Sequence, residues 1–450
     1  MTSPLTASTH SVRLILNTAV LLTAFTLVVR ATGALKEILF ARAYGVSGDT
    51  DAFVLAGTYA MFLPTIVGGA IGTALIAALA ETKGSFRGAG LGNVTLGISV
   101  VACIVAMMMY ALAPFVMASV FDQSGEALEK ATLYARILSP LGATLLAASA
   151  MEALLNSAKQ FYIAGLAGIA MPLAIIFAIL FLADRWGVEA AAWGTVVGGI
   201  AEVLMVSARI YSQRREFFGN HARAAARVGW TFWKSAAILS LAGSISVAAP
   251  FVDQIFLSRL ETGAVTSLNY ASKVNSLLIG VFGTAFSAAI YPYLSDLAAQ
   301  RDIRGLKRLT WRLSAVVLPV TGIAMVAVYA LSYEIIELLF ARGKFTAASV
   351  LEVGSIQRIF AFQLPLYVAG LLAMRVLNAA GASKFVLYVS CISLASTALL
   401  DWLFYQRLGA GGIALSAVLT SGVSLACVIA FIRPALARHR QMAAARGAPQ

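Results

Sequence analysis

The chain has 450 residues, of which 60% are hydrophobic and only 12% are charged, and its mean hydropathy is +0.86. Soluble domains average about 45–50% apolar and about 25% charged residues, so this composition excludes a soluble globular protein and a disordered chain. Outer-membrane barrels are excluded as well, because their strands alternate apolar and polar residues. We therefore predict an all-α polytopic membrane protein.

Stretches without charged residues indicate about twelve transmembrane helices, because a crossing helix needs roughly 20 mostly apolar residues. The first resembles a signal peptide but lacks a cleavage site before Arg30, so we expect it to be retained. In chain order, the expected spans are 14–29, 52–80, 88–121, 137–151, 160–183, 188–208, 235–252, 274–295, 313–333, 359–374, 385–400 and 408–432.

The positive charges predict how these spans cross the membrane. Of the 33 Lys and Arg residues, twenty fall in segments on the side of the N-terminus and six in the opposite loops. Cytoplasmic loops carry the excess of Lys and Arg, so we expect both termini in the cytoplasm. The net charge of +13 suits binding to anionic lipid headgroups. We expect no nucleic-acid partner, because the sequence contains no soluble basic domain.

A basic segment after the sixth span divides the chain into two sets of six helices. We expect lobes at 1–211 and 235–432, joined by a basic cytoplasmic linker at 212–234 and followed by a basic cytoplasmic tail at 433–450. An internal repeat supports the division, because the string Gly72–Ala78 recurs with changes as Gly283–Ala289. Two such halves point the same way through the membrane, an arrangement common in secondary transporters.

Charges within apolar helices are costly and mark candidate functional residues. The densest group lies between the first two spans: Arg30, Lys36, Glu37, Arg42 and Asp51. Arginine and lysine facing a cavity would suit a phosphate or pyrophosphate group. The alternative is an interfacial helix whose charges reach out to water.

The second half adds Asp253, Lys273 and Asp401 in or next to apolar runs. Such acids pair with a cation, a proton or a basic side chain, so either an ion site or a structural pair with Lys273 or Arg375 is open. The sequence has no P-loop, no nucleophile elbow and no His/Cys/acid cluster, so we expect a transporter without catalytic residues or a bound metal, and not an enzyme.

Four segments resemble one known family: Arg30–Gly45 with Thr50–Phe53, Tyr270–Lys273, Gly280–Gly283 leading to Pro292–Ser295, and Phe340–Thr346. These strings resemble the MurJ/MviN lipid II flippases of the multidrug/oligosaccharidyl-lipid/polysaccharide exporter superfamily. The resemblance implies two six-helix lobes that form a V-shaped central cavity. With twelve expected spans, this chain would have two helices fewer than the resemblance implies, and it lacks the cavity arginine that the resemblance implies around Pro64.

The resemblance also implies roles for residues. Substrate would be bound by Arg30, Lys36, Glu37, Asp51 and Lys273, with Lys36, Glu37 and Lys273 standing where the family usually has Arg, Asp and Arg. A coupling Na⁺ or H⁺ would be held by Asp253, Thr397 and Asp401.

These implications predict a flippase that moves an undecaprenyl-pyrophosphate-linked glycan, with lipid II favoured, by alternating access in peptidoglycan biosynthesis. The alternatives are a flippase for an exopolysaccharide or O-antigen precursor and an ion-coupled multidrug exporter. A membrane glycan polymerase is disfavoured because the outer loops are short. We expect a monomer in the bacterial cytoplasmic (inner) membrane, with a lipid-linked oligosaccharide as partner; an association with the cell-envelope synthesis machinery is left open.

Overall fold

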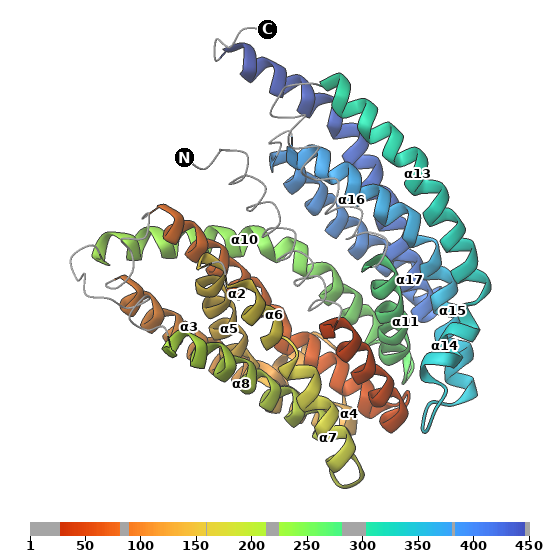
Figure 1. Cartoon of the computed structure of the whole chain (residues 1–450). Coiled ribbons are helices and arrows are strands. Elements are labelled where there is room, and N and C mark those ends of the chain that lie inside the picture. The colour runs from red at the N-terminus through yellow and green to blue at the C-terminus, as the bar shows by residue number, and fades with distance from the viewer. Residues whose placement is uncertain are drawn as a thin grey trace, which may run out of the picture. The chain divides into compact units, whose positions relative to one another are not determined.

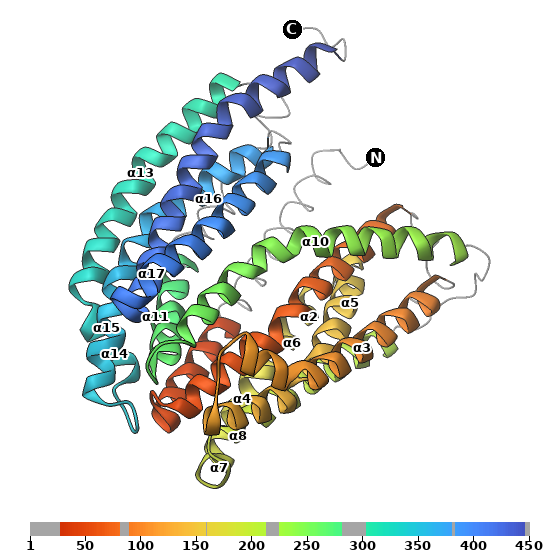
Figure 2. The same cartoon turned by 180° about the vertical axis from the view of Figure 1, so that it is seen from behind.

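The computed structural model describes residues 28–81, 90–158, 160–212, 225–280, 303–379 and 383–445. Over these residues the chain forms helices and no strand (Figures 1 and 2). The helices are 28–44, α2 Gly48–Glu81, α3 Gly90–Ser119, α4 Gly125–Leu138, α5 Leu141–Ser157, α6 Phe161–Ala167, α7 Ala170–Trp186, α8 Glu189–Ser212, α10 Ala225–Leu257, α11 Ala264–Ile279, α13 Ile303–Ala330, α14 Ser332–Phe340, α15 Ala347–Ala361, α16 Gln363–Ala379 and α17 Ser383–Ala445.

Eight helical segments of the described chain are long and apolar enough to cross a membrane, and a bent pair within α10 makes nine. The last segment, Lys384–Ile432, includes a break at Gly409 and corresponds to the two predicted spans 385–400 and 408–432. The predicted spans 14–29 and 274–295 lie largely outside the described residues, as do the strings Gly283–Ala289 and Pro292–Ser295. An all-helical multi-pass membrane fold is therefore confirmed, and the described spans agree with a total of twelve.

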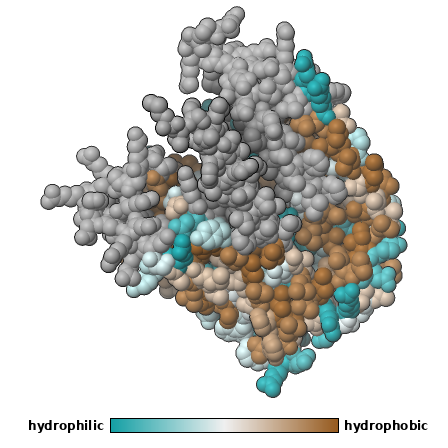
Figure 3. Space-filling model, viewed as in Figure 1, coloured by the Kyte–Doolittle hydropathy of each residue, from teal (hydrophilic) through white to brown (hydrophobic). Residues whose placement is uncertain are grey.

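Apolar side chains cover the outer faces of the helices, as expected where a protein meets lipid. Met107, Phe181, Ile323 and Leu338 are each more than 70% exposed. Figure 3 shows the same property as broad hydrophobic areas over the described surface. These surfaces have lipid as their solvent, so their exposure carries no penalty in the membrane.

Packing divides the chain into two compact units: Met1–Tyr44 with Leu55–Val247, and Gly45–Val54 with Ala248–Gln450. The first two turns of α2 thus belong to the second unit, although the rest of this helix belongs to the first. The predicted linker at 212–234 includes residues 213–224, and the predicted tail includes 446–450, all outside the described residues. The proposed lobe boundaries therefore stay predictions.

In the first unit, small residues let two helices approach closely. Gly194 and Gly198 on α8 face α7, and a Cβ added to Gly198 would lie 2.5 Å from the Cα of Met171. No side chain larger than hydrogen fits this contact, which is the usual reason for a GxxxG spacing in membranes. The pair α7 and α8 forms a rigid wall of this unit.

In the second unit, an aromatic cluster joins α11 to the segment after α14. The ring of Tyr270 lies 5.0 Å from that of Phe340 and 5.5 Å from that of Phe345, between ring centroids. The Tyr270 hydroxyl donates a hydrogen bond to the carbonyl oxygen of Gly45 at 3.3 Å. The family-like strings Tyr270–Lys273 and Phe340–Thr346 therefore meet each other beside Gly45.

Six glycines of the described chain have positive φ, and they lie in turns between helices, at the first residue of a helix or, for Gly409, at a break within α17. Gly187, between α7 and α8, has φ 56° and ψ −139°, and Gly409, within α17, has φ 57° and ψ −140°. The other four form two further pairs at one spacing: Gly45 with Gly263, and Gly125 with Gly343. The turns of the first half of the chain thus recur in the second.

Candidate functional site

Three of the five predicted substrate-binding residues lie on the helix over residues 28–44, in the first unit. Arg30 is exposed and has no ion-pair partner among the residues that the structure describes. Lys36 Nζ lies 2.7 Å from Glu37 Oε1, and both side chains are largely buried. Because Glu37 compensates the charge of Lys36, the exposed Arg30 and Arg42 are the cations of this helix that are more available to an anionic group.

Asp51 belongs to the second unit, where its carboxylate binds the N-terminus of α11. It accepts hydrogen bonds from the backbone N–H of Thr266 at 2.8 Å, from the Thr266 hydroxyl at 2.6 Å and from the backbone N–H of Gly263. The free N–H groups at a helix start favour a negative charge, and Gly263 at the N-cap has no side chain to supply one. Asp51 therefore caps a helix that is distant in sequence, and its predicted role in substrate binding stays a prediction.

Lys273, the fifth predicted substrate-binding residue, lies on α11 and its side chain is exposed. It belongs to the second unit together with Asp51. The predicted set is thus divided, with Arg30, Lys36 and Glu37 in the first unit. Its joint action on one substrate stays a prediction.

The predicted ion-coupling residues meet in the second unit. Asp401 on α17 is fully buried, and among the residues that the structure describes neither of its carboxylate oxygens has a hydrogen-bond partner. Asp253, at the end of α10, is half-buried and interacts electrostatically with Asp401. Thr397 lies one turn before Asp401, is buried, and has its hydroxyl 3.4 Å from that of Thr420. A buried carboxylate whose oxygens are unpaired among the described residues, next to a second acid, needs a proton or a cation to compensate its charge.

Sequence reasoning missed the hydroxyls on the second arm of α17. Ser416 is fully buried and lies within interaction range of Asp401, and its oxygen has no hydrogen-bond partner within the described part of the chain. Thr420 contacts Thr397. Neither residue is charged, so a search for charges in apolar helices passes over them. The signal that could have found them is a row of hydroxyls at helical spacing in the span 408–432.

These groups suit a small hard cation or a proton. Carboxylate and hydroxyl oxygens are the donors that hard cations take, and no soft ligand is present in the set. The described residues contain no group of three or more His, Cys, Asp or Glu that could hold a metal ion. Two carboxylates with neutral hydroxyls therefore fit Na⁺ or H⁺ better than a divalent metal.

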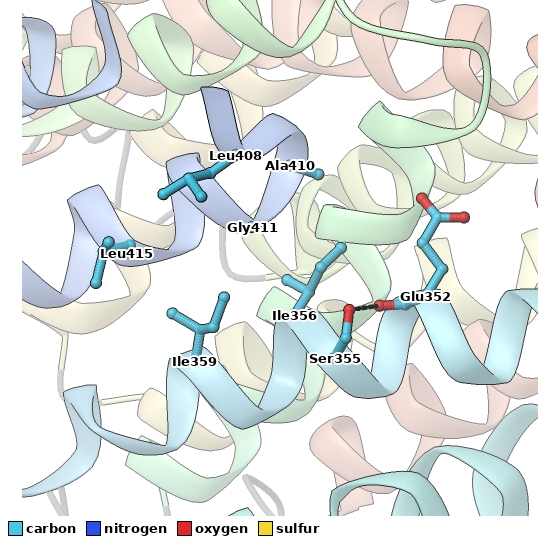
Figure 4. A pocket seen from close by; sticks show the side chains of 8 residues that line it. All are labelled: Glu352, Ser355, Ile356, Ile359, Leu408, Ala410, Gly411 and Leu415. Atoms are coloured by element: carbon cyan, nitrogen blue, oxygen red, sulfur yellow. Dashed lines mark hydrogen bonds between the residues drawn. The ribbon is translucent and has the colours of Figure 1, made fainter. Parts of the chain in front are cut away.

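A cavity of about 360 Å³ lies between α15 and the Gly409 region of α17 (Figure 4). Glu352 is the one charged residue among those that line it, and its carboxylate lies apart from the apolar side chains in the view. The wall of the cavity includes Leu415, the neighbour of Ser416 in sequence. The apolar lining does not suit a pyrophosphate. The lining residues are Glu352, Ser355, Ile356, Ile359, Leu408, Ala410, Gly411 and Leu415.

Comparison with known proteins identifies the family. The sequence model of the family described as lipid II flippase MurJ matches residues 40–446. The chain belongs to the lipid II flippase MurJ family. The matched range includes Asp51, Asp253, Lys273, Thr397 and Asp401, and it begins after Arg30, Lys36 and Glu37. Membership confirms the predicted family and the predicted transporter class.

The sequences of individual relatives align with this chain over most of their length. A lipid II flippase MurJ of Burkholderia cenocepacia is 27% identical over an alignment of 420 residues, which covers 87% of this chain and 78% of that protein. A probable lipid II flippase MurJ of Rhizobium tropici is 26% identical over 407 residues, covering 86% of this chain and 75% of that protein.

Solved structures share the fold. A lipid II flippase MurJ in an inward closed conformation superposes with a TM-score of 0.80 at 22% identity, covering 92% of this chain and 87% of that chain. An inward-facing multidrug resistance MATE transporter of the MOP superfamily superposes with a TM-score of 0.72 at 16% identity, covering 92% and 99%. The fold of the MOP superfamily, expected from the sequence, is confirmed.

Proposed function

We propose that this protein is a lipid II flippase that moves its substrate from the inner to the outer leaflet by alternating access. The observation that carries the proposal is the match of the MurJ family model over residues 40–446. Relatives of the same name align over more than three quarters of this chain, which supports one shared activity. Flipping changes no covalent bond, so the chemistry required is binding and release.

Binding would use the cations Arg30, Lys36 and Lys273 to hold the pyrophosphate of the substrate. An arginine fork or a lysine ammonium forms charge-assisted hydrogen bonds with phosphate oxygens, each contributing about 1.5–3 kcal/mol. Arg30 is exposed, and Lys36 is paired with Glu37. We infer that Glu37 orients Lys36, and that Asp51 acts by fixing α11, which carries Lys273.

Coupling would use Asp253, Thr397 and Asp401, with the hydroxyl of Ser416 as a fourth group. An uncompensated carboxylate inside a membrane protein is costly, so occupancy by Na⁺ or H⁺ stabilises this part of the second unit. The unpaired oxygens of Asp401 support the assignment. A transmembrane ion gradient could then supply free energy for the transport cycle.

The alternative predicted from the sequence, an ion-coupled multidrug exporter, is compatible with the fold, which is shared with a MATE transporter at a TM-score of 0.72. Cationic drugs require acidic or aromatic binding groups, whereas the candidate residues on 28–44 include two cations and one acid. We therefore favour the lipid-linked substrate. We also propose that the protein is a monomer of the bacterial inner membrane. The charge bias of the loops supports the proposal that both termini are cytoplasmic.

The deciding experiment is reconstitution of the purified protein in vesicles with three substrates in separate arms: lipid II, an O-antigen-type lipid-linked precursor, and a cationic drug. Translocation of lipid II alone, together with rescue of a strain depleted of its own lipid II flippase, is the expected result. Transport of the drug without lipid II would overturn the proposal in favour of the exporter.

A further inference from the structure

Arg358 on α15 lies between two tyrosine rings. Its guanidinium carbon is 4.4 Å from the ring centroid of Tyr333 and 5.2 Å from that of Tyr329. Both distances are within the range of a cation–π interaction, which contributes about 0.5–2 kcal/mol. Tyr329 ends α13 and Tyr333 begins α14, so the arginine connects three helices of the second unit.

Tyr329 and Tyr333 form an aromatic cage around Arg358, and the packing of α15 fixes this cage. Gly354 lies one turn before Arg358, and a Cβ added to Gly354 would collide with the ring of Tyr333. Glycine at this position therefore lets the tyrosine ring lie flat against the helix and over the arginine. The orientation of the cage is set before any ligand binds.

The charge of Arg358 is not compensated within the part of the chain that the structure describes. Among the described residues no carboxylate lies within ion-pair distance of Arg358, and none accepts a hydrogen bond from its buried Nε. Tyrosine rings attract a cation but accept few of the five N–H donors of a guanidinium. A partly buried arginine without an anion is costly, and the cost is higher next to lipid.

The cage borders the lipid-facing surface. Tyr329 is 43% exposed, and Phe362, which packs edge-on against it at 5.6 Å between centroids, is 46% exposed. On the same helix as Tyr329, Ile323 and Val326 are among the most exposed apolar residues. Side chains of a helix lean toward its N-terminus, so Arg358 extends toward the α13–α14 turn, where tyrosines are typical of the membrane–water interface.

We propose that Arg358, with Tyr329 and Tyr333, binds the phosphate group of a membrane phospholipid. The headgroup phosphate is the anion present at the interface, and it matches the planar fork of arginine. The acyl chains would lie along the exposed apolar face of α13. The site is separate from the residues proposed for lipid II and from the acid pair, and it does not depend on the transport function.

The test is native mass spectrometry of the full chain extracted from nanodiscs of phosphatidylethanolamine and phosphatidylglycerol. The wild type should retain one phospholipid, and Arg358→Ala should lower the retained fraction about tenfold, the effect of losing one charged hydrogen bond. Arg358→Lys should fall between them, because it keeps the charge and loses the fork. Arg342→Ala removes an exposed arginine whose one hydrogen bond is to the Leu338 carbonyl oxygen, and it should retain the lipid as the wild type does.

Equal retention by Arg358→Ala and the wild type would overturn the proposal. Displacement of the lipid by inorganic phosphate or pyrophosphate at millimolar concentration would also overturn it, in favour of a soluble anion. If Arg358→Ala does not fold, Gly354→Ala provides the test with all charges in place, since it displaces the Tyr333 ring and should also reduce retention. Retention unchanged in a folded Gly354→Ala variant would then reject the cage.

Discussion

The carboxylate of Asp51 accepts a hydrogen bond from the backbone N–H of Thr266 at 2.8 Å, across 215 residues of sequence. An N-cap normally comes from the residue that precedes the helix, because that side chain is already in place. In this protein the residue at the N-cap of α11 is Gly263, and the cap comes from the first turn of α2 instead. The start of α2 and the start of α11 are thereby fixed to each other.

Asp51→Asn should destabilise this connection. The amide presents N–H groups to the N–H donors of Gly263 and Thr266, so at least one charge-assisted bond is lost, at a cost of about 1–3 kcal/mol in the free energy of unfolding. Thermal unfolding in detergent should show a lower midpoint. Glu126→Gln, which alters a carboxylate that is 79% exposed, should leave the midpoint unchanged. Equal midpoints for the two variants would contradict the cap.

Gly45→Ala should lower the unfolding midpoint of the protein more than a glycine-to-alanine change in a helix with open space around it. Gly45 has φ +64°, and an added Cβ would collide with the carbonyl oxygen of Lys344. The left-handed conformation alone costs about 1–2 kcal/mol for a residue with a Cβ, and the collision adds to it. Gly33→Ala is the matched control, because Gly33 lies in a helix with open space around its Cβ position and should gain about 0.5–1 kcal/mol. Unfolding midpoints that fall in the first variant and not in the second would support the contact.

Arg30→Ala should abolish growth of a flippase-depleted strain at normal membrane levels of the protein. Lys36→Arg should be tolerated, because it keeps the ion pair with Glu37 and adds a fork suited to phosphate. Immunoblots of membranes separate lost function from lost protein. Normal growth of the Arg30→Ala strain would remove this residue from the proposed pyrophosphate contacts.

Asp253→Asn and Asp401→Asn should each abolish transport stimulated by a sodium or proton gradient. The amide keeps the size of the carboxylate but carries no charge for the ion. Lipid II translocation in vesicles, with and without an imposed gradient, is the measurement. Ser416→Ala should weaken the dependence on the ion without abolishing it, because it removes one neutral ligand. If both Asn variants respond to the gradient as the wild type does, the acids are structural.

Cysteine labelling should test the orientation. A cysteine at Ser124, in the turn before α4, should react with an impermeant reagent in intact cells. One at Tyr211, at the exposed end of α8, should react only after permeabilisation. The expectation rests on the distribution of Lys and Arg. The reverse pattern would invert the proposed topology.

The sequence predicted what depends on local composition. Charge-free stretches marked the spans because an apolar helix in lipid satisfies its own backbone hydrogen bonds wherever it lies in the fold. It could not predict that Asp51 caps α11, since the pairing joins residues 215 positions apart. The search for charged residues also passed over Ser416, because its hydroxyl is neutral and only the row of hydroxyls at helical spacing marks it in the sequence. Arg358 directly precedes the predicted span 359–374, and no local pattern could place the ring of Tyr333 over it.

The paired glycines of the turns bear on how this chain enters its membrane. Each left-handed glycine joins two helices through a short connection, so neighbouring helices are tied as hairpins: Gly187 for α7 and α8, and Gly409 for the two arms of α17. A hairpin can leave the translocon as one element, with both polar ends on the same side. Biogenesis would then proceed by hairpins rather than by single helices. The recurrence of these turns means that each half of the chain carries its own set of hairpins.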